Sequence, residues 1–290
     1  MAINSVVCVK QVPDTTQVRI DPETGSLIRH GLPSVVNPFD LHAVEAALRL
    51  RDIYGGRVTA LSMGPPQAEE SLRKVLGFGV NRAVLLSDRA FAGADTLATT
   101  YALAAAIRKI AAEEPVDLVI CGKQSIDGDT GQVGPGLAHR LGMSQVTYIC
   151  GLEEIDLEAR TIKAWRQLET GRELLEAKLP AALTITETCN RIRYASLPDL
   201  IAAAEQPVEI WGVDDIEVER EHLGLKGSPT RVNKIFAPPV RERGEIFAAA
   251  DSSAAEVAAT VFDRLALRGV TLGGNGRSTS IADSKPVGDT

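Results

Sequence analysis

Aromatic side chains are scarce in this sequence: Phe, Trp and Tyr make up 4% of its 290 residues. Proteins that stack nucleic-acid bases need such side chains, so the scarcity argues against a base-stacking platform. The net charge of −7 also argues against binding to a polyphosphate backbone. The core must be aliphatic, which is typical of buried parallel strands covered by Ala-rich helices. We therefore expect no nucleic-acid partner, and a small nucleotide, a metabolite or another protein remains.

Clustered cysteines and histidines are absent as well. The four cysteines lie far apart without a CxxC pair, and the four histidines show no metal-ligand spacing. We therefore predict no metal site, no iron–sulfur cluster and no disulfide framework. The cysteines are expected to be free, buried thiols.

Long apolar runs are missing too. No run approaches the roughly 18 residues of a membrane span, and Lys10 interrupts the first apolar stretch. Neither a signal peptide nor a membrane span is expected, so the sequence favours a cytoplasmic location.

The common nucleotide-binding and catalytic motifs do not occur. There is no GxGxxG after the first strand, no Walker A loop, no GxSxG and no HExxH. These absences argue against a Rossmann dinucleotide fold, a P-loop protein, an α/β-hydrolase and a zinc protease. Since no nucleophile has a base beside it, we predict no catalytic residue.

The first 150 residues alternate short apolar segments with segments of helical spacing. The short segments, predicted as strands buried on both faces, are 5–10, 57–63, 82–86 and 117–122. Helices are predicted where Leu41, Val44 and Leu48 recur, over 96–112, and from Val133 to a stop at Gly142. This order predicts a parallel-sheet α/β fold: a three-layer α/β/α domain, without GxGxxG, followed by a C-terminal arm.

Later segments are less regular. A hairpin is predicted around the DPETG turn in 17–28, and 165–171 with 179–186 suggest another extended pair. One short helix is expected within 191–205, followed by an acidic, Gly- and Pro-rich arm that packs on something else. We therefore expect an α/β domain over 1–190, an arm over 191–240, a helical segment over 241–270 and a disordered tail over 271–290.

The loop after the fourth predicted strand is the most informative stretch. Glycines at 122, 128 and 131 permit close approach of a ligand, and Asp129 or Thr130 is predicted to cap the next helix. Free N–H groups there suit a phosphate, because ligands of parallel sheets bind beyond the carboxyl ends of the strands. Asp127 and Asp129 fit caps or acceptors of ribose hydroxyls better than a metal site. A well-capped loop without a ligand remains the alternative.

Two other helix starts carry similar signals. Asn37 is predicted to cap the first helix, with Pro38 at its first position and Asp40 favourable to the dipole. Asp95 and Thr96 open the Ala-rich helix in the same way. Capping alone would explain both segments, so their role in binding stays open on local features.

Seven motifs in register resemble the β subunits of electron transfer flavoproteins. In chain order they are VCVKQVPD, VNPFDLHAVEAALRLRD, LSDRAFAGADTLAT, GKQSIDGDTGQVGP, LPAALT, RYASLPDL and GLKGSPTRVNKIF. The resemblance runs from Val6 to about Pro239. It departs from the family pattern at Asn81, where relatives usually carry a carboxylate.

The resemblance implies a heterodimer with an electron transfer flavoprotein α subunit. Ordinary β subunits carry AMP, with the electron-shuttling flavin bound mainly by the α subunit. A second group, associated with electron bifurcation, carries FAD in place of AMP. This sequence is most similar to that group, and within it to the Fix-type proteins of nitrogen fixation. The group takes a hydride from NADH and passes electrons to a flavin dehydrogenase or quinone oxidoreductase and to ferredoxin or flavodoxin. A quinone-reducing partner would place it at the membrane periphery.

The resemblance implies that the 1–190 domain binds an adenine nucleotide or flavin and that 191–240 contains a partner-recognition loop. It also implies functional positions. Its cofactor-binding places fall on Cys8, Asn37, Pro38, Phe39, Asp40, Met63, Gly122, Lys123, Gln124, Ser125, Ile126, Asp127, Gly128, Asp129, Thr130, Gly131, Gln132 and Val133. Further contacts for FAD are implied at Asp95, Thr96 and Thr99. The partner-recognition loop corresponds to Arg193, Tyr194, Ala195, Ser196, Leu197 and Pro198, with Leu197 as its apolar anchor.

A different class remains as an alternative: an ATP-binding regulatory or adenylating protein on the same type of sheet. Such an enzyme would be expected to carry a Ser/Gly-rich loop after the first strand, where this sequence has Lys10 to Asp14. A yellow complex with an α partner would support the flavoprotein, and colourless protein that turns over ATP would support the alternative.

Overall fold

The computed structural model describes residues 2–14, 19–20, 27–28, 34–231, 244, 246–247 and 253–270. By its internal contacts the chain divides into two units, 1–237 and 238–290. Each unit is described by itself.

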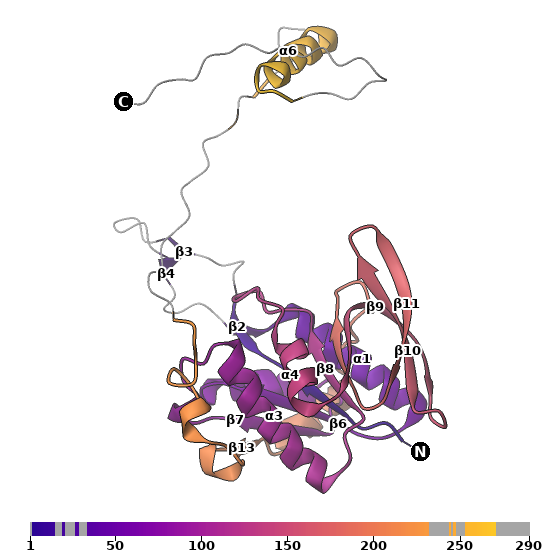
Figure 1. Ribbon diagram of the computed structural model, residues 1–290, viewed down its shortest axis with the longest axis vertical. Helices are drawn as coiled ribbons and strands as arrows, with labels where there is room; N and C mark the ends of the chain where they lie inside the picture. Colours follow the sequence, from indigo (N-terminus) through magenta and orange to yellow (C-terminus); the bar gives the residue numbers. More distant parts are fainter. Residues whose placement is uncertain are drawn as a thin grey trace. The chain divides into compact units, whose positions relative to one another are not determined.

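The first unit is built on a nine-stranded sheet with the order β11-β10-β9-β12-β8-β1-β6-β7-β13 (Figure 1). Its central strands are β1 (Ser5–Cys8), β6 (Val58–Met63), β7 (Arg82–Leu86), β8 (Leu118–Gly122) and β12 (Ala181–Ile185). These five strands pair in parallel, so their carboxyl ends share one edge of the sheet. The four predicted strands of the first 150 residues are thereby confirmed, with ends shifted by at most two residues.

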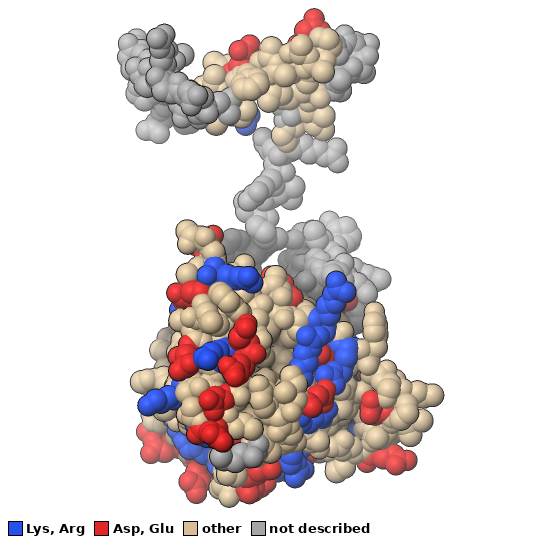
Figure 2. All heavy atoms as spheres, turned by 90° about the vertical axis from the view of Figure 1, so that its right-hand side faces the viewer, with Lys and Arg blue, Asp and Glu red and all other residues tan. Residues whose placement is uncertain are grey.

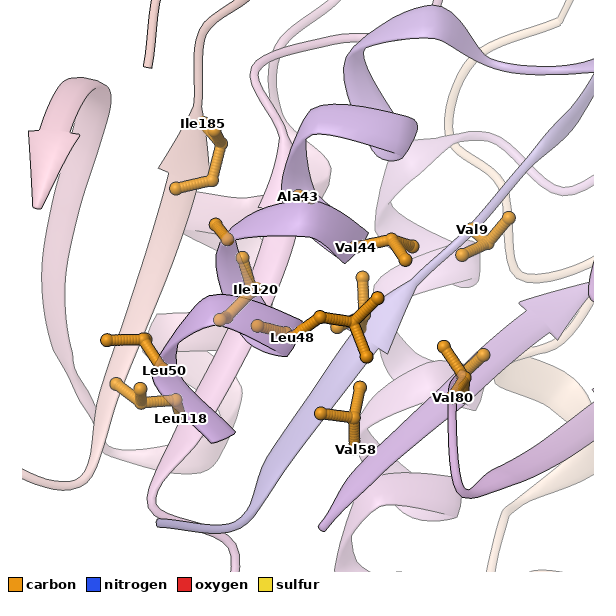
Figure 3. Packing of buried hydrophobic residues seen from close by; sticks show 14 of the residues in the cluster. Val9, Ala43, Val44, Leu48, Leu50, Val58, Val80, Leu118, Ile120 and Ile185 are labelled. Atoms are coloured by element: carbon orange, nitrogen blue, oxygen red, sulfur yellow. The ribbon is translucent and has the colours of Figure 1, made fainter. Parts of the chain in front are cut away.

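Two pairs of helices cover the sheet and complete three layers. Helices α1 (Pro38–Tyr54) and α2 (Glu69–Leu76) pack on one face, where Val9, Leu48 and Ile120 are among the buried residues (Figure 3). Helices α3 (Thr96–Glu113) and α4 (Val133–Leu141) cover the other face. Successive strand residues alternate between the two faces, as Val6 and Val7 do. The predicted three-layer α/β/α fold is confirmed.

Both faces are packed with aliphatic side chains, as the scarcity of aromatic residues predicts. Ala and Leu dominate the buried sides of the helices, and Leu48 and Leu118 are fully buried. Burial of one such side chain contributes about 1.5–3 kcal/mol to folding. Among the six phenylalanines of the sequence, Phe91 is buried in the core beside α3.

The antiparallel part of the sheet differs from the prediction. Strands β9 (Ser144–Asp156), β10 (Thr161–Leu168) and β11 (Gly171–Lys178) form a meander, and β9 also pairs in parallel with β12. The predicted pairing of 165–171 with 179–186 is wrong, because β9 lies between β10 and β12 in the sheet. Figure 2 faces this side of the unit and shows acidic and basic side chains interspersed there, in line with pairs such as Lys163–Glu154.

Two small ribbons precede α1. Strands β2 (Gln11–Pro13) and β5 (Ser34–Val36) pair antiparallel, and so do β3 (Arg19–Ile20) and β4 (Leu27–Ile28). The β3–β4 pair confirms the hairpin predicted around the DPETG turn; the turn itself lies outside the described residues.

The segment after residue 190 packs on its own unit rather than elsewhere. Helix α5 (Leu197–Glu205) contacts α2, and β13 (Glu209–Trp211) joins the sheet beside β7. Trp211, Val213 and Ile216 are buried against α3. The prediction that this arm packs on something else is therefore wrong for residues 209–230, because a few apolar residues among the acidic ones anchor it to its own unit.

Of the second unit the structure describes chiefly α6 (Ala254–Leu267). Ser253 and Glu256 form a capping box at its start. The predicted tail, 271–290, and the end of the predicted arm, 232–240, lie outside the described residues. Among the described helices, none is long and apolar enough to cross a membrane.

Candidate functional site

The candidate site lies at the carboxyl edge of the sheet, where β1, β6, β8 and β12 end together. The chain leaves β8 at Gly122 and enters α4 at Val133. Residues 123–132 form the loop between them, which we call the β8–α4 loop. Residues 127–130 of this loop are exposed, whereas 123–126 are partly buried.

Asn37 fastens this loop to the start of α1. Its side chain is almost fully buried, donates to the carbonyl of Gln124 at 2.8 Å and accepts from the N–H of Ile126 at 3.2 Å. It makes no capping hydrogen bond to α1. The prediction that Asn37 caps the helix is therefore wrong: its amide is used across about ninety residues of sequence.

Asp40 joins the ends of two strands below the loop. Its carboxylate accepts from the backbone N–H of Lys10 at 2.8 Å and from that of Gly122 at 3.2 Å. Burial raises the pKa of Asp40 to about 7, although these hydrogen bonds act to lower it. The first turn of α1 therefore ties β1 to β8 where both enter the site.

Gly122 has a packing role. A Cβ at this position would clash with Phe39 and with the Asp40 carboxylate. Glycine is required at 122 because the start of α1 packs directly against it. Gly131 is required for a different reason: its backbone has φ +63°, which favours glycine.

Lys10 closes one side of the loop. Its ammonium group donates to both oxygens of Asp127, at 2.7 and 2.8 Å. Burial acts to raise the pKa of Asp127, but the hydrogen bonds from Lys10 and Ser125 and the charge of Lys10 outweigh it and leave this pKa below its usual value. Lys10 is missing from the residues predicted for the site, although the KQVPD motif contains it.

The exposed part of the loop is folded on itself. Asp129 has φ +58°, accepts from the side chain of Gln124, and donates its N–H to the carbonyl of Ser125 at 2.8 Å. It does not cap α4, and neither does Thr130: the helix begins after Gln132 without a side-chain cap. The predicted cap at Asp129 or Thr130 is therefore wrong.

The start of α4 has no side-chain cap. The first N–H groups of a helix have no partner within the helix, and here the N-cap residue Gln132 does not bond them, which leaves the N–H groups of Val133 and Gly134 as candidate donors to a ligand. Gly134 lets this turn lie directly against β12, because a Cβ would clash with Thr184. Positive potential at a helix N-terminus favours a negatively charged group such as a phosphate.

Helix α3 begins beside this opening. Asp95 caps it by accepting from the N–H groups of Leu97 and Ala98 at 3.0 and 3.1 Å, as predicted. The hydroxyl of Thr96 donates to the side chain of Gln132 at 2.7 Å. The structure thus brings Asp95 and Thr96 together with the end of the β8–α4 loop.

The other predicted cofactor-binding residues flank this edge. Met63 ends β6 and is half-buried, and Thr99 lies on the first turn of α3, where its N–H bonds the carbonyl of Asp95. Pro38 is exposed, and the Phe39 ring lies 4.8 Å from the Lys123 ammonium group. Tyr148, near Gly131, is exposed.

Cys8 is buried beneath the edge rather than facing it. A hydrogen bond with Cys8, together with burial, raises the pKa of the Cys121 thiol well above its usual value. Such thiols are protonated and inert as nucleophiles. All four cysteines are free; Cys8 and Cys121 are buried as predicted, whereas Cys150 and Cys189 are only partly buried.

The predicted partner-recognition residues form an exposed apolar surface at the start of α5. Tyr194 and Leu197 are 99% and 71% exposed. Ser196 caps the helix through the N–H of Asp199, and Arg193 is fastened to α1 by ion pairs with Glu45 and Asp52. Tyr194 and Leu197 therefore project from a segment that is fixed to α1. In the sequence, Ala195 lies between these two residues and Pro198 follows Leu197.

Only one group of three potential metal-ligating side chains occurs among the described residues: Glu219, Glu221 and His222. All three are exposed, and His222 packs edge-on against Tyr101.

Comparison with known proteins decides the family. The model of the electron transfer flavoprotein domain matches residues 24–216. The chain is 50% identical over 263 residues to protein FixA of Bradyrhizobium diazoefficiens, covering 90% of this chain and 91% of the relative. It is 48% identical to the electron transfer flavoprotein subunit beta of Clostridium acetobutylicum, covering 91% of this chain and 98% of the relative.

The chain is a β subunit of the electron transfer flavoprotein family, of the Fix group. It is also 47% identical to the CarD subunit of the caffeyl-CoA reductase–Etf complex of Acetobacterium woodii, over 90% of this chain and 97% of the relative. As a member of the family it serves electron transfer with an α subunit and with electron-transfer partners, and its cofactor chemistry is that of flavoproteins.

Proposed function

We propose that this β subunit binds FAD at the carboxyl edge of its sheet and belongs to a complex that bifurcates electrons from NADH. When bound, the flavin supplies the redox chemistry: it accepts a hydride as an electron pair and releases electrons singly. The protein binds and orients it. The observation that carries the proposal is the uncapped start of α4 behind a loop fastened at its base by Asn37 and Asp40.

The donors and acceptors of this edge fit an adenine nucleotide. The open N–H groups of α4 suit a phosphate, and Gly131 allows close approach of the backbone. Thr130 and Asp129 are exposed polar groups within the loop that suit ribose hydroxyls. Lys10 and Asp127 hold the neighbouring part of the loop in place.

FAD rather than AMP is supported by polar side chains at the start of α3, beyond the β8–α4 loop. Thr96 is linked to Gln132, and Thr99 lies one turn further along α3. AMP ends at its single phosphate, whereas FAD continues through a second phosphate and a ribityl chain that need further polar contacts. The relative CarD belongs to an Etf complex with caffeyl-CoA reductase, which is consistent with a place in a larger redox assembly.

The aromatic residues of this subunit offer little stacking surface. Five aromatic residues lie near the site in sequence: Phe39, Phe78, Phe91, Tyr101 and Tyr148. Of these, Phe91 is buried in the core and Tyr101 packs against His222. Tyr148 is exposed beside Gly131 and is the candidate to contact a ring. Backbone groups, Met63 and short polar side chains would then hold most of the flavin, with the α subunit over its other side.

We further propose that Leu197 docks a flavin dehydrogenase or quinone oxidoreductase, and that ferredoxin or flavodoxin takes the second electron. The exposed apolar side chains of Tyr194, Leu197 and Ile201 support a docking surface for a protein partner. The complex would be found in the cytoplasm, or at the membrane periphery where it binds a quinone-reducing partner.

Counting nucleotides tests the cofactor. The chain is purified together with its α subunit, the complex is denatured, and the released nucleotides are separated and quantified. We expect two FAD per heterodimer. One FAD and one AMP would overturn the FAD assignment and make this the ordinary electron-shuttling type. Colourless protein that hydrolyses or transfers ATP would overturn the flavoprotein assignment altogether.

A further inference from the structure

A segment far along the chain crosses the start of α3. Residues 223–230, which we call the strap, follow a short helical turn and lie against the 89–92 turn before α3. Leu223 is buried in the core, and the N–H of Leu225 bonds the carbonyl of Ala92 at 3.0 Å. The strap lies beyond residues 24–216, which the family model matches.

Two glycines let the strap lie this close. Gly224 has φ +52°, and a Cβ on it would clash with the carbonyl of Ala90. A Cβ on Gly227 would clash with the backbone of His222. The backbone path of the strap is therefore tightly restricted, which is unlike an arm that rests loosely on a surface.

Asp95 receives four hydrogen bonds, two of them from the strap. One carboxylate oxygen caps α3, and the other accepts from the N–H of Thr230 at 3.1 Å and from its hydroxyl at 2.8 Å. The N–H of Asp95 donates to the hydroxyl of Ser228 at 2.8 Å, and that hydroxyl donates to the carbonyl of Gly224 at 2.6 Å. Ser228 is buried.

These contacts change the role of Asp95. Both of its oxygens are engaged within the protein, so it is not free to accept from a nucleotide as long as the strap is in place. The next residue, Thr96, donates to Gln132 at the end of the β8–α4 loop. Hydrogen bonds from the strap to Asp95 and from Thr96 to Gln132, joined by the peptide bond between residues 95 and 96, thus connect the strap to the start of α4.

We propose that Ser228 and Thr230 are positioning residues of the nucleotide site: the strap holds Asp95 and, through Thr96, sets the position of Gln132. This inference rests on the proposed function, because it assumes that a nucleotide binds at this edge. It assigns the effect to the strap side chains acting through Asp95, without contact between the strap and the nucleotide.

The test compares Thr230→Val, which removes the hydroxyl, with Thr230→Ser, which keeps it. Each full-length variant is purified with the α subunit, and the dissociation constants of FAD and of AMP for this subunit are measured alongside the thermal midpoint. We expect T230V to weaken binding of the resident nucleotide about tenfold, the size expected for one lost hydrogen bond to a carboxylate. T230S should bind within about twofold of wild type. Thr170→Val, an exposed threonine in the β10–β11 turn, is the control and should bind like wild type.

A double-variant cycle separates positioning from loss of stability. Asp95→Asn keeps a helix cap but removes the charge that Thr230 bonds. If the strap acts through Asp95, D95N/T230V should bind no more weakly than D95N alone. Additive losses, or a lower thermal midpoint of T230V with unchanged nucleotide affinity, would overturn the inference. If wild-type heterodimer binds neither FAD nor AMP in this subunit, the proposed function fails as well; if it binds and T230V binds equally well, only the inference fails.

Discussion

Asp40 is the buried charge-bearing residue at the base of the site. Its carboxylate connects the backbone of Lys10 with that of Gly122, and burial raises its pKa to about 7. In the unfolded chain the carboxyl group has its usual pKa near 3.8. Between those two values the folded protein binds more protons at Asp40 than the unfolded chain does, so this residue lowers the free energy of unfolding as the pH rises.

Asp40→Asn should remove that pH dependence. The variant carries no titrating group at position 40, but its amide offers one oxygen to two N–H donors and costs about 1–3 kcal/mol for the donor left unpaired. We expect the stability of wild type relative to D40N to be larger at pH 5 than at pH 8. Thermal midpoints of the two full-length chains across this range check it. A difference that does not change with pH would contradict the raised pKa.

Residue roles were predictable from the sequence only where the partner is local. Asp95 caps α3 as predicted, because its first two partners lie two and three residues away. Asn37 has the same local signal, yet its amide bonds the loop at 124–126, which the sequence around residue 37 does not reveal. Lys10 was missed for the same reason, since its partner Asp127 lies 117 residues further along.

At the scale of elements, helix α5 presents the surface proposed for the redox partner. Pro198 occupies its first turn, and Ser196 caps it. Leu197, Leu200 and Ile201 are exposed, while Ala203 packs into the core beside α2. The helix therefore has one face fixed to the domain and an apolar face left for another protein.

Leu197→Ala should weaken docking and leave the cofactor in place. An apolar anchor at the centre of a small interface contributes at least about 2 kcal/mol, so the apparent dissociation constant for the dehydrogenase partner should rise about thirtyfold. Leu168→Ala, an exposed leucine of β10, is the matched control. Electron-transfer rates measured against partner concentration check this. Equal losses in L168A and L197A, or release of flavin from L197A, would speak against a docking role.

Elements buried on both faces were predictable because they are continuous apolar runs. Strands β1, β6, β7 and β8 all belong to this kind, and all were found. Strand β11 was missed because it lies at the sheet edge and its charged residues and leucines stand in adjacent pairs (GRELLEAK) instead of alternating. Strand β9 was missed because Gly151 and two glutamates interrupt it. Strand β13 has three residues, too few to form a pattern before its neighbour β7 is known.

At the scale of the whole molecule, the proposed nucleotide site is built from aliphatic packing and backbone contacts, and few aromatic residues are needed for it. The aliphatic core supports a parallel sheet, the carboxyl edge of the sheet carries the β8–α4 loop, and the strap braces the start of α3. Each of these features depends on contacts between distant parts of unit 1–237. The family resemblance predicted the location of the site; the structure adds which residues are engaged in holding it.

The central claim is that the nucleotide lies over the β8–α4 loop and the first turns of α4 and α3. Hydrogen exchange of backbone amides, measured on the heterodimer with its nucleotides bound and after their removal, tests it most directly. Residues 123–134 and 96–99 of this chain should exchange more slowly when the nucleotide is bound, and residues 161–178 of the β10–β11 hairpin should not change. Unchanged exchange over 123–134 in a complex that demonstrably holds a nucleotide in this subunit would contradict the account.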